Sequence, residues 1–313
     1  MSLQLTATRV AMRALERTAP GLGAALAERL FFTPPRTTLT PPIRDVLATG
    51  LPFRVCVDDA RVAAWAWGHG PAVALVHGWG GRGGRLAAAF VAPLVARGFS
   101  VITFDAPGHG ASDGKLSSMP QVARALLAVA DAAGSLYGLV AHSMGGSASA
   151  LAIAEGLQVE RAVFIGPAAD PARYAEDFAK LLGIGPVAMA AMRRRSEARL
   201  RFRWSDLNVP RLAATLDTPL LVLHDRDDPT VPWEEGAAIA GSWLGAELVT
   251  TTGLGHRDIV KDPAVVARAV DFLRAAEMGT PPCAVNDEGA WVDRDLYERD
   301  TRRRRLFGIS DTK

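Results

Sequence analysis

Short apolar runs recur through the middle of the chain, separated by stretches long enough to form helices. The runs lack apolar–polar alternation, a pattern that is typical of strands buried on both faces. We predict six such strands, at residues 72–76, 100–104, 136–140, 162–165, 219–223 and 246–250. We predict helices between them, near residues 85–97, 119–133, 144–156, 234–243 and 258–275. This order predicts an α/β fold, with a mostly parallel central sheet and helices on both of its faces.

Three other stretches depart from this rhythm. Residues 5–32 predict two short helices that pack on the domain, with a break at Pro20-Gly21. After Pro41-Pro42 the pattern alternates, and residues 53–57 and 62–67 predict a hairpin at the edge of the sheet. The segment between Ile165 and Pro219 has helical patterns and no strand pattern, which indicates an insertion over the strand ends and a candidate lid.

These changes predict four parts of the chain. They are a helical N-terminal arm at 1–43, a core at 44–166 and 214–276, a small helical lid at 167–213, and a C-terminal extension at 277–313. In the extension, the run Arg302–Arg305 is interpreted as a solvated charge cluster. Docking of this tail through Trp291, Leu296 and Tyr297 is the alternative.

The composition is that of a globular protein. Of 313 residues, 49% are hydrophobic and 22% are charged, and the net charge of +2 argues against nucleic acid as the main partner. Cys56 and Cys283 have no metal or redox spacing, so we expect a reducing, cytoplasmic setting with no metal and no cofactor. No apolar run is long enough to span a bilayer, and stable membrane insertion is not expected. The oligomeric state stays open.

A serine between small residues follows one of the predicted strands. In Ala141-His142-Ser143-Met144-Gly145-Gly146, the apolar strand runs directly into a small-residue helix. A sharp strand-to-helix turn of this kind holds a hydroxyl nucleophile away from the backbone. An inert Ser/Gly turn is the alternative, so the assignment of Ser143 depends on finding partners for it.

Candidate partners follow other predicted strands. His256, within Gly253-Leu254-Gly255-His256, follows the last strand and is the candidate base. The acid-rich turn Asp225–Asp228 follows the strand at 219–223, and Asp228 is the candidate acid because Pro229 restricts its backbone to extended conformations. Asp225 and Asp227 are interpreted as residues that solvate the loop or cap the turn.

The loop His77-Gly78-Trp79-Gly80-Gly81 supports two interpretations. It can supply the backbone N–H of Trp79 to an oxyanion hole, together with that of Met144, and Trp79 and His142 are then expected to contact substrate. Alternatively, the residues from Gly78 to Gly83 match the dinucleotide fingerprint G-x-G-x-x-G, with Asp105 as a ribose-binding acid. His77 and the dense motif from Asp105 to Gly114 have no role in that alternative.

Taken together, the motifs resemble those of the α/β-hydrolase superfamily, in its serine esterase/lipase-like branch. The matching pieces are His77–Gly80, the loop 105–114, Ala141–Gly146, Asp228–Pro232 and Gly255-His256, in the order of that family. The resemblance covers about residues 44–276. One departure is Ala141, where the family usually has glycine, and this change constrains packing at the turn.

The resemblance implies an enzyme that cleaves a carboxylic ester through Ser143, His256 and Asp228 with an acyl-enzyme intermediate. A thioesterase or an acyltransferase would use the same triad, so the partner is a small acyl ester or thioester. Two readings from other classes stay open: an NAD(P)-dependent oxidoreductase and a catalytically silent binding protein with this fold.

Specificity is expected to come from the lid. Six apolar side chains are candidate walls of an acyl pocket, or alternatively pack the lid onto the body: Tyr174, Phe178, Leu181, Leu182, Met189 and Met192. Six arginines lie within eleven residues: Arg193, Arg194, Arg195, Arg199, Arg201 and Arg203. They form either a solvated helix face or an attractive surface for an anionic acyl substrate.

Overall fold

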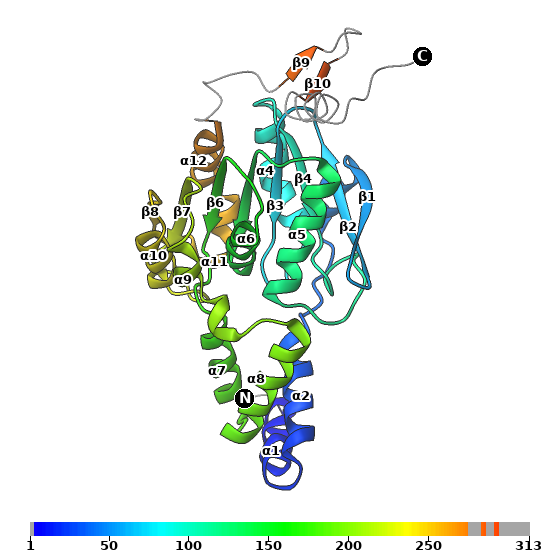
Figure 1. Cartoon of the computed structure of the whole chain (residues 1–313), viewed down its shortest axis with the longest axis vertical. Coiled ribbons are helices and arrows are strands. Elements are labelled where there is room, and N and C mark those ends of the chain that lie inside the picture. The colour runs from blue at the N-terminus through cyan, green and yellow to red at the C-terminus, as the bar shows by residue number, and fades with distance from the viewer. Residues whose placement is uncertain (1–2, 275–282, 286–290, 294–313) are drawn as a thin grey trace, which may run out of the picture. The chain divides into compact units, whose positions relative to one another are not determined.

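The computed structural model describes residues 3–274, 283–285 and 291–293, and the chain divides into two units (Figure 1). The first unit comprises residues 1–273 and the second comprises residues 274–313. In the second unit, strand β9 (Cys283–Val285) pairs antiparallel with β10 (Trp291–Asp293). The side chains through which the tail was predicted to dock, and the run Arg302–Arg305, lie outside the described part of the chain.

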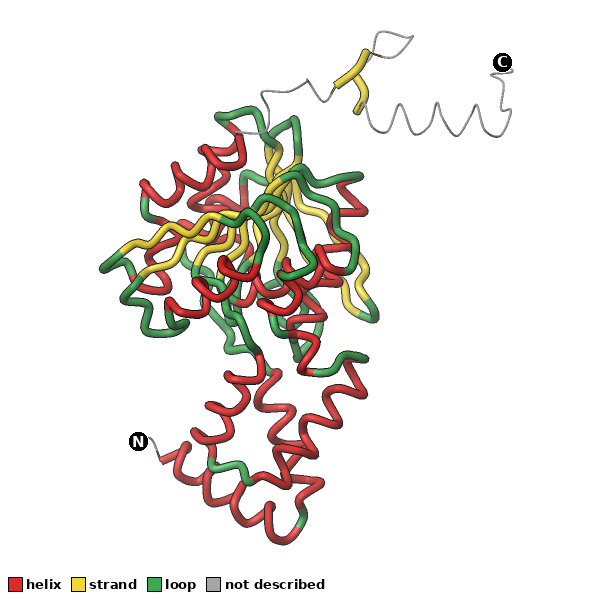
Figure 2. The backbone as a smooth tube through the Cα atoms, turned by 60° about the vertical axis from the view of Figure 1, so that its left-hand side comes forward, coloured by secondary structure: helices red, strands yellow, loops and turns green. Residues whose placement is uncertain are grey.

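An eight-stranded sheet forms the centre of the first unit (Figure 2). Its order in space is β1-β2-β4-β3-β5-β6-β7-β8, and the strands from β4 through β3 to β8 are parallel. β1 and β2 form the antiparallel hairpin at one edge, as predicted. The bounds are β1 Leu51–Val57, β2 Ala60–Trp67, β3 Ala72–Val76, β4 Ser100–Phe104, β5 Gly138–His142, β6 Arg161–Ile165, β7 Leu220–Asp225 and β8 Glu247–Thr251.

Both faces of the sheet are buried by helices, which explains the nearly all-apolar strands. Along β6, Ala162 and Phe164 belong to the buried cluster that includes helices α5 and α6, while Val163 and Ile165 belong to the cluster with α4 and α12. The helices that cover the sheet are α4 Gly83–Val95, α5 Met119–Ala133, α6 Met144–Ala154, α9 Val209–Ala213, α10 Trp233–Ser242 and α12 Pro263–Arg274. The predicted α/β-hydrolase fold is confirmed.

The sheet order reverses beside β3. The chain adds β4 on one side of β3 and then crosses to add β5 on the other side. Loops that leave β3 and β5 therefore diverge, and they open a crevice beyond the carboxyl ends of these strands, where parallel sheets bind their ligands.

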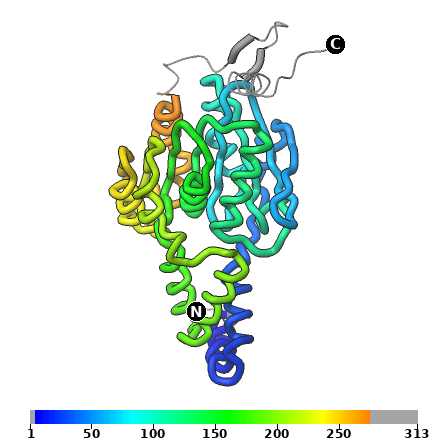
Figure 3. Tube along the Cα trace, viewed as in Figure 1, coloured from blue at the N-terminus to red at the C-terminus, as the bar shows by residue number. Residues whose placement is uncertain are grey.

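A second helical layer lies beyond those strand ends (Figures 2 and 3). It combines α1 (Leu3–Thr18) and α2 (Pro20–Phe32) with α7 (Pro171–Leu182) and α8 (Pro186–Leu200), so segments far apart in sequence lie together. Their shared buried cluster contains Met12, Ala24, Ala27, Ala175, Met192 and Trp204. The two N-terminal helices, which the sequence predicted to pack on the domain, pack on the insertion between β6 and β7.

Some predicted boundaries were wrong. Helix α3 (Pro41–Ala48) occupies a stretch where an alternating pattern was expected to begin, because Pro at its first positions favours a helix start. The strand predicted at 136–140 is β5 at Gly138–His142, and the last predicted helix begins at Pro263 after the short helices α11 (Gly255–Asp258) and η2 (Ile259–Lys261). In the described part of the chain, no helix combines the length and apolarity needed to cross a membrane.

Candidate active site

Ser143 occupies a strained turn between β5 and α6. Its backbone has φ 56° and ψ −128°, a conformation that residues with a side chain rarely adopt. The turn is held because the Ser143 N–H donates to the carbonyl of Ile165 on the neighbouring strand, at 2.9 Å. Ser143 is thus raised out of the line of the strand at the sheet's carboxyl edge. The sequence of this strand-to-helix turn, here called the elbow, predicted that position.

The small residues after Ser143 are required by close backbone approach. A Cβ atom at Gly145 would lie 2.4 Å from the carbonyl oxygen of Val76 at the end of β3. Ala141, where the family usually has glycine, is fully buried in the strand. Within this turn, the close approach to β3 falls on Gly145 and not on Ala141.

The structure brings Ser143, His256 and Asp228 together in one chain of contacts. His256 Nε2 lies 3.0 Å from Ser143 Oγ, and His256 Nδ1 lies 2.7 Å from Asp228 Oδ2. Ser143 and His256 are 9% and 8% exposed, so the contact between the hydroxyl and the imidazole is shielded from most solvent. A hydroxyl, an imidazole and a carboxylate in this order can pass a proton from the hydroxyl to the imidazole.

Asp228 is fixed by the turn that it begins. Its Oδ1 accepts hydrogen bonds from the backbone N–H groups of Thr230 and Val231, at 2.8 and 2.9 Å. Burial raises the pKa of Asp228, but hydrogen bonds from His224, His256 and these two N–H groups outweigh it and lower the pKa below its usual value. The carboxylate is therefore ionised at neutral pH and keeps Oδ2 directed at His256.

The other two acids of this turn have structural partners. Asp225 is fully buried and accepts hydrogen bonds from the Thr251 hydroxyl and the Leu254 N–H, which joins β7 to the loop before His256. Asp227 accepts a hydrogen bond from the Gly253 N–H. Turn capping describes both residues, whereas loop solvation is wrong for Asp225 because no part of it reaches solvent.

His142 contacts the loop that carries His256. Its Nε2 lies 2.8 Å from the backbone carbonyl oxygen of His256, and burial, followed by the charge of His256, lowers the pKa of His142 to about 3. His142 is therefore neutral at pH 7, and a nitrogen facing a carbonyl carries the proton. His142 lines the cavity as expected for a substrate contact, but its Nε2–H is engaged by the protein.

The loop after β3 crosses directly in front of Ser143. A Cβ atom at Gly78 would lie 2.7 Å from Ser143 Cβ, so this glycine is what lets the loop approach. In the described residues, the backbone N–H groups of Trp79 and Met144 have no protein hydrogen-bond partner. Met144 begins helix α6, whose N-terminal end favours negative charge. Both groups are therefore available to an oxyanion beside Ser143.

Two buried histidines hold this loop in place. His77 Nε2 accepts a hydrogen bond from the Ala106 N–H at 2.9 Å, and His109 Nε2 accepts one from the Gly80 N–H at 3.1 Å. Burial lowers the pKa of both histidines, that of His109 to about 3. They therefore remain neutral and able to accept. No local sequence pattern indicated these pairings, which join residues 29 positions apart.

Asp105 has a structural role that bears on the dinucleotide alternative. Its carboxylate is 1% exposed and accepts hydrogen bonds from the backbone N–H groups of Gly83 and Ala111, at 2.9 and 2.8 Å. A ribose-binding acid needs a carboxylate that faces the ligand. Because the Asp105 carboxylate binds the loop itself, the fingerprint from Gly78 to Gly83 gains no support as a nucleotide site.

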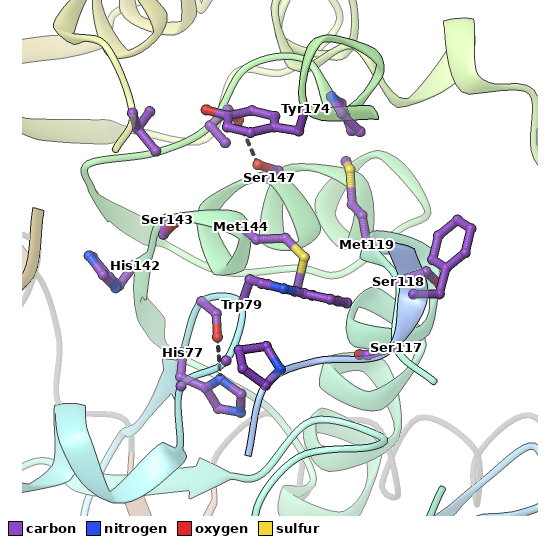
Figure 4. Close-up of a pocket in the computed structure, with 18 of the residues that line it drawn as sticks. His77, Trp79, Ser117, Ser118, Met119, His142, Ser143, Met144, Ser147 and Tyr174 are labelled. Carbon is purple, nitrogen blue, oxygen red and sulfur yellow. Dashed lines mark hydrogen bonds between the residues drawn. The ribbon is translucent and has the colours of Figure 1, made fainter. Parts of the chain in front are cut away.

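A cavity of about 540 Å³ opens in front of Ser143 (Figure 4). In the view of Figure 4, Ser143 and Met144 lie between Trp79 on one side and Tyr174 on the other. Trp79, Met144 and His256 line the cavity, as do Tyr174 and Phe178 from helix α7. Its volume lies within the range of about 300–1,000 Å³ typical of small-molecule sites.

The lid lines this cavity, but with a different set of residues from the six that the sequence suggested, since Ala168, Pro171, Leu200, Trp204 and Leu207 also belong to the lining. Of the six expected apolar wall residues, Tyr174 and Phe178 line it, Leu181 is 53% exposed, and Met192 is fully buried against the N-terminal helices. None of the six lid arginines lines the cavity. Arg195 and Arg199 pair with Glu28, and Arg193 pairs with Glu197, so an attractive surface for anionic substrates is not supported.

A family model described as the alpha/beta hydrolase family matches residues 73–269. The chain belongs to the α/β-hydrolase family. The match contains Ser143, Asp228 and His256, together with Trp79 and Met144, and ends before α12 does. It leaves residues 1–72 outside, including helices α1 and α2.

One curated relative matches part of the chain. A curated protein of Pseudomonas savastanoi pv. phaseolicola, "Putative carbamate hydrolase RutD", is 33% identical over 120 residues, which are 37% of this chain and 44% of that protein. The chain thus aligns with less than half the length of that relative.

Solved structures share the fold at low sequence identity. The esterase RhEst1 from Rhodococcus sp. ECU1013 has a TM-score of 0.55 and 20% identity, over 72% of this chain and 99% of its own. A bromoperoxidase from Bacillus anthracis has a TM-score of 0.55 and 18% identity, over 72% of this chain and 100% of its own. Because proteins named esterase and bromoperoxidase share this fold, the fold alone does not identify the reaction.

Proposed function

We propose that this protein is a serine hydrolase that cleaves a carboxylic ester, with Ser143 as nucleophile, His256 as base and Asp228 as orienting acid. The observation that carries the proposal is the pair of contacts at 3.0 Å and 2.7 Å that links these residues through the two nitrogens of one imidazole. Family membership and the esterase among the structural neighbours support it.

In the first step, Ser143 Oγ attacks the carbonyl carbon of the ester while His256 Nε2 takes the hydroxyl proton. Asp228 accepts the Nδ1–H of His256 and stabilises the positive charge that develops on the ring. The negative charge on the former carbonyl oxygen is stabilised by the N–H groups of Trp79 and Met144, which are already positioned before the reaction begins.

In the second step, the tetrahedral intermediate collapses and its C–O bond to the alcohol breaks. His256 gives its proton to the leaving alcohol, which yields an acyl-enzyme on Ser143. Water then attacks the acyl carbon while His256 removes a proton from it. The second tetrahedral intermediate collapses, its bond to Ser143 Oγ breaks, and His256 returns the proton to Ser143 as the carboxylic acid leaves. A thioesterase would follow the same steps with a thiolate as the leaving group, and an acyltransferase would replace the water by another acceptor.

The ester assignment is preferred to the carbamate named for the relative because of the cavity. Its lining includes several aromatic and aliphatic side chains, which suit a substrate with a sizeable apolar group. The same serine could attack a carbamate carbonyl. The fit of the groups attached to the carbonyl to the cavity therefore distinguishes the two substrates.

The division of the chain into parts and its cellular location are also proposals. We interpret residues 1–43 and 167–213 as parts of one helical cap over the core, and 277–313 as an extension. The buried cluster shared by α1, α2, α7 and α8 supports the cap. The cytoplasmic location and the absence of a nucleic-acid partner stay predictions from composition.

Labelling with a fluorophosphonate tests the proposed nucleophile directly. The wild-type protein is expected to be labelled at one site, and the Ser143→Ala variant is expected to resist labelling. The matched control is Ser149→Ala, in the same α6 helix, where the hydroxyl is fully buried and bonds the carbonyl of Gly145. Labelling of Ser143→Ala at the wild-type level, or no labelling of a folded wild type, would overturn the assignment.

Esterase and thioesterase activities are then separated by matched substrates. Esters and thioesters with the same acyl chain are compared through kcat/KM, with and without added alcohol acceptors. The proposal expects the ester to be hydrolysed and the acyl group to go to water. Transfer of most of the acyl group to an added acceptor would assign the protein as an acyltransferase instead.

A further inference from the structure

The N-terminal arm forms one wall of the cavity in front of Ser143. Six residues from the end of α2 and the segment after it line this space: Leu30, Phe31, Phe32, Thr33, Pro35 and Thr37. All of them lie outside the stretch that matches the family model. The family match therefore does not account for the shape of the cavity on this side.

Aromatic rings from the arm and the lid meet at this wall. The Phe31 ring centroid lies 5.2 Å from that of Phe178 in α7 and 6.2 Å from that of Trp204, with Phe31 and Trp204 nearly parallel at 27°. These three side chains all line the cavity. Rings at such separations form a continuous apolar surface whose faces favour contact with a hydrocarbon chain or another ring.

Two carboxylates, one of them buried, join the arm to the lid. The Glu28 carboxylate, 7% exposed, accepts hydrogen bonds from Arg195 Nε at 3.1 Å and Arg199 Nε at 2.8 Å. The Glu16 carboxylate accepts from the backbone N–H groups of Val187 and Ala188 at the start of α8. These contacts join α1 and α2 of the arm to α8 of the lid, and the buried Glu28 carboxylate has both of its arginine partners there.

The segment after α2 is also joined to the core beside the reacting serine. The Ser117 N–H donates to the carbonyl of Phe32 at 2.8 Å, and Arg82 donates to the carbonyl of Thr37. Pro35 lies against the oxyanion loop, since a Cβ atom at Gly80 would be 2.7 Å from Pro35 Cγ. The arm therefore connects the distal apolar wall with the loop that contains Trp79.

The chemistry of the lining indicates what the wall contacts. Among the described residues that line the cavity, the arginines are Arg85 and Arg257 and no acidic side chain is present. Neither arginine belongs to the arm or to the aromatic group. The far side of the cavity thus offers apolar contacts and little that would solvate a charge.

We propose that the N-terminal arm, through Phe31, forms the binding site for the apolar chain of a medium-chain ester. This rests on the proposed function, whose ester carbonyl lies at Ser143. A methylene group has roughly the size of a water molecule, about 30 Å³ in the liquid, so a chain of about ten carbons would occupy roughly 300 Å³. Such a chain fits within the cavity of about 540 Å³.

Two substrate series test the proposal on the full chain. One series lengthens the acyl chain of p-nitrophenyl esters from two to sixteen carbons, and the other lengthens the alcohol of alkyl acetates. In wild type, kcat/KM is expected to rise about fourfold per added methylene in one series until the cavity is filled. Phe31→Ala and Phe31→Leu are expected to lower kcat/KM for the ten-carbon substrate about tenfold, with the two-carbon substrate nearly unchanged.

The matched control is Leu22→Ala, on the same helix. Leu22 is 66% exposed and does not line the cavity, so its substitution is expected to leave both ends of each series unchanged. Equal chain-length profiles for wild type and for a folded Phe31→Leu variant would overturn the proposal. A wild-type profile that is flat or falls beyond two carbons in both series would also overturn it.

Binding without turnover separates this inference from the proposed reaction. In a Ser143→Ala background, the Kd of the preferred ten-carbon ester is measured by calorimetry with Phe31 intact and with Phe31→Leu. A Kd weakened about tenfold by the second substitution supports the chain site even if wild type hydrolyses no ester. Ester hydrolysis by wild type, together with a Kd that does not depend on Phe31, would retain the reaction and overturn the chain site.

Discussion

The Nε2 atom of His142 lies 2.8 Å from the backbone carbonyl oxygen of His256, and the two rings lie 4.6 Å apart with a tilt of 39°. The residue immediately before Ser143 therefore holds the loop that carries the proposed base. Because neutral His142 donates this hydrogen bond, it sets where the His256 backbone lies relative to the elbow. We regard His142 as a positioning residue that acts through His256.

Replacing His142 should slow the reaction without removing the triad. We expect His142→Ala to lower kcat about tenfold with a smaller change in KM, because one buried hydrogen bond and the ring contact are lost. His142→Gln, whose amide can still donate, should recover part of the loss. Steady-state kinetics on a soluble ester measures both values, and an unchanged kcat in a folded His142→Ala protein would contradict the assignment.

The neutral buried histidines should make the fold sensitive to acid. His109 and His142 each have a pKa of about 3 in the folded protein, against about 6.5 for an unfolded histidine. Between these values the unfolded chain binds more protons, so the free energy of unfolding falls as the pH falls from about 6.5 toward 3. The slope is about 1.4 kcal/mol per pH unit for each histidine, and the contribution is fully present above pH 6.5.

Urea unfolding at pH 7, 6 and 5 measures this dependence. His142→Gln should reduce the slope below pH 6 by about 1.4 kcal/mol per pH unit, since the variant has lost one of the histidines whose pKa burial lowers. The control is His69→Gln, at an exposed loop position, which should keep the slope of the wild type. A slope unaffected by His142→Gln would mean that this residue is not held neutral by the fold.

Asp228 and its neighbour Asp227 should differ sharply in their effect on rate. Asp228→Asn keeps the size of the side chain but removes the charge facing His256 Nδ1, and kcat is expected to fall about 10⁴-fold. Asp227→Asn should change kcat by less than about threefold, because Asp227 contacts the Gly253 N–H and not the imidazole. Equal losses in the two variants would place the acid role elsewhere.

Gly78 should tolerate no side chain. A Cβ atom there would lie 2.7 Å from Ser143 Cβ and 3.0 Å from the carbonyl oxygen of His142, so the oxyanion loop must move away from the serine. We expect Gly78→Ala to lower kcat/KM by about 100-fold or more, since small displacements of reacting groups are costly. Circular dichroism and kcat/KM would be measured together to separate loss of geometry from loss of fold.

The comparison for Gly78 is Gly241 in helix α10, where an added Cβ would meet no atom within 4 Å. Gly241→Ala should leave kcat/KM unchanged and stabilise the protein by roughly 0.5–1 kcal/mol, because alanine is the better helix former. If both alanine variants kept full activity, the loop would have more freedom than its contacts indicate.

The local pattern of the sequence determined the fold class and the order of the chemical motifs. Apolar strands such as β6 can be recognised because burial on both faces requires apolar residues along their length. Ser143 can be recognised because a strained turn needs small neighbours, and Pro229 distinguishes Asp228 among three acids through backbone restriction. These signals are local, so they can be recognised without knowing which strands are neighbours.

Contacts between distant residues were decided only by the tertiary structure. His77, His109 and His142 look alike in sequence, and their roles depend on which backbone group each ring nitrogen meets, in one case 114 residues away. The cavity wall at Phe31 depends on helix α2 packing against α8, and nothing local in either helix specifies the other as its partner. The sequence alone therefore determined which chemistry the chain could perform, whereas the packing of the arm decided the shape of the space in which a substrate would bind.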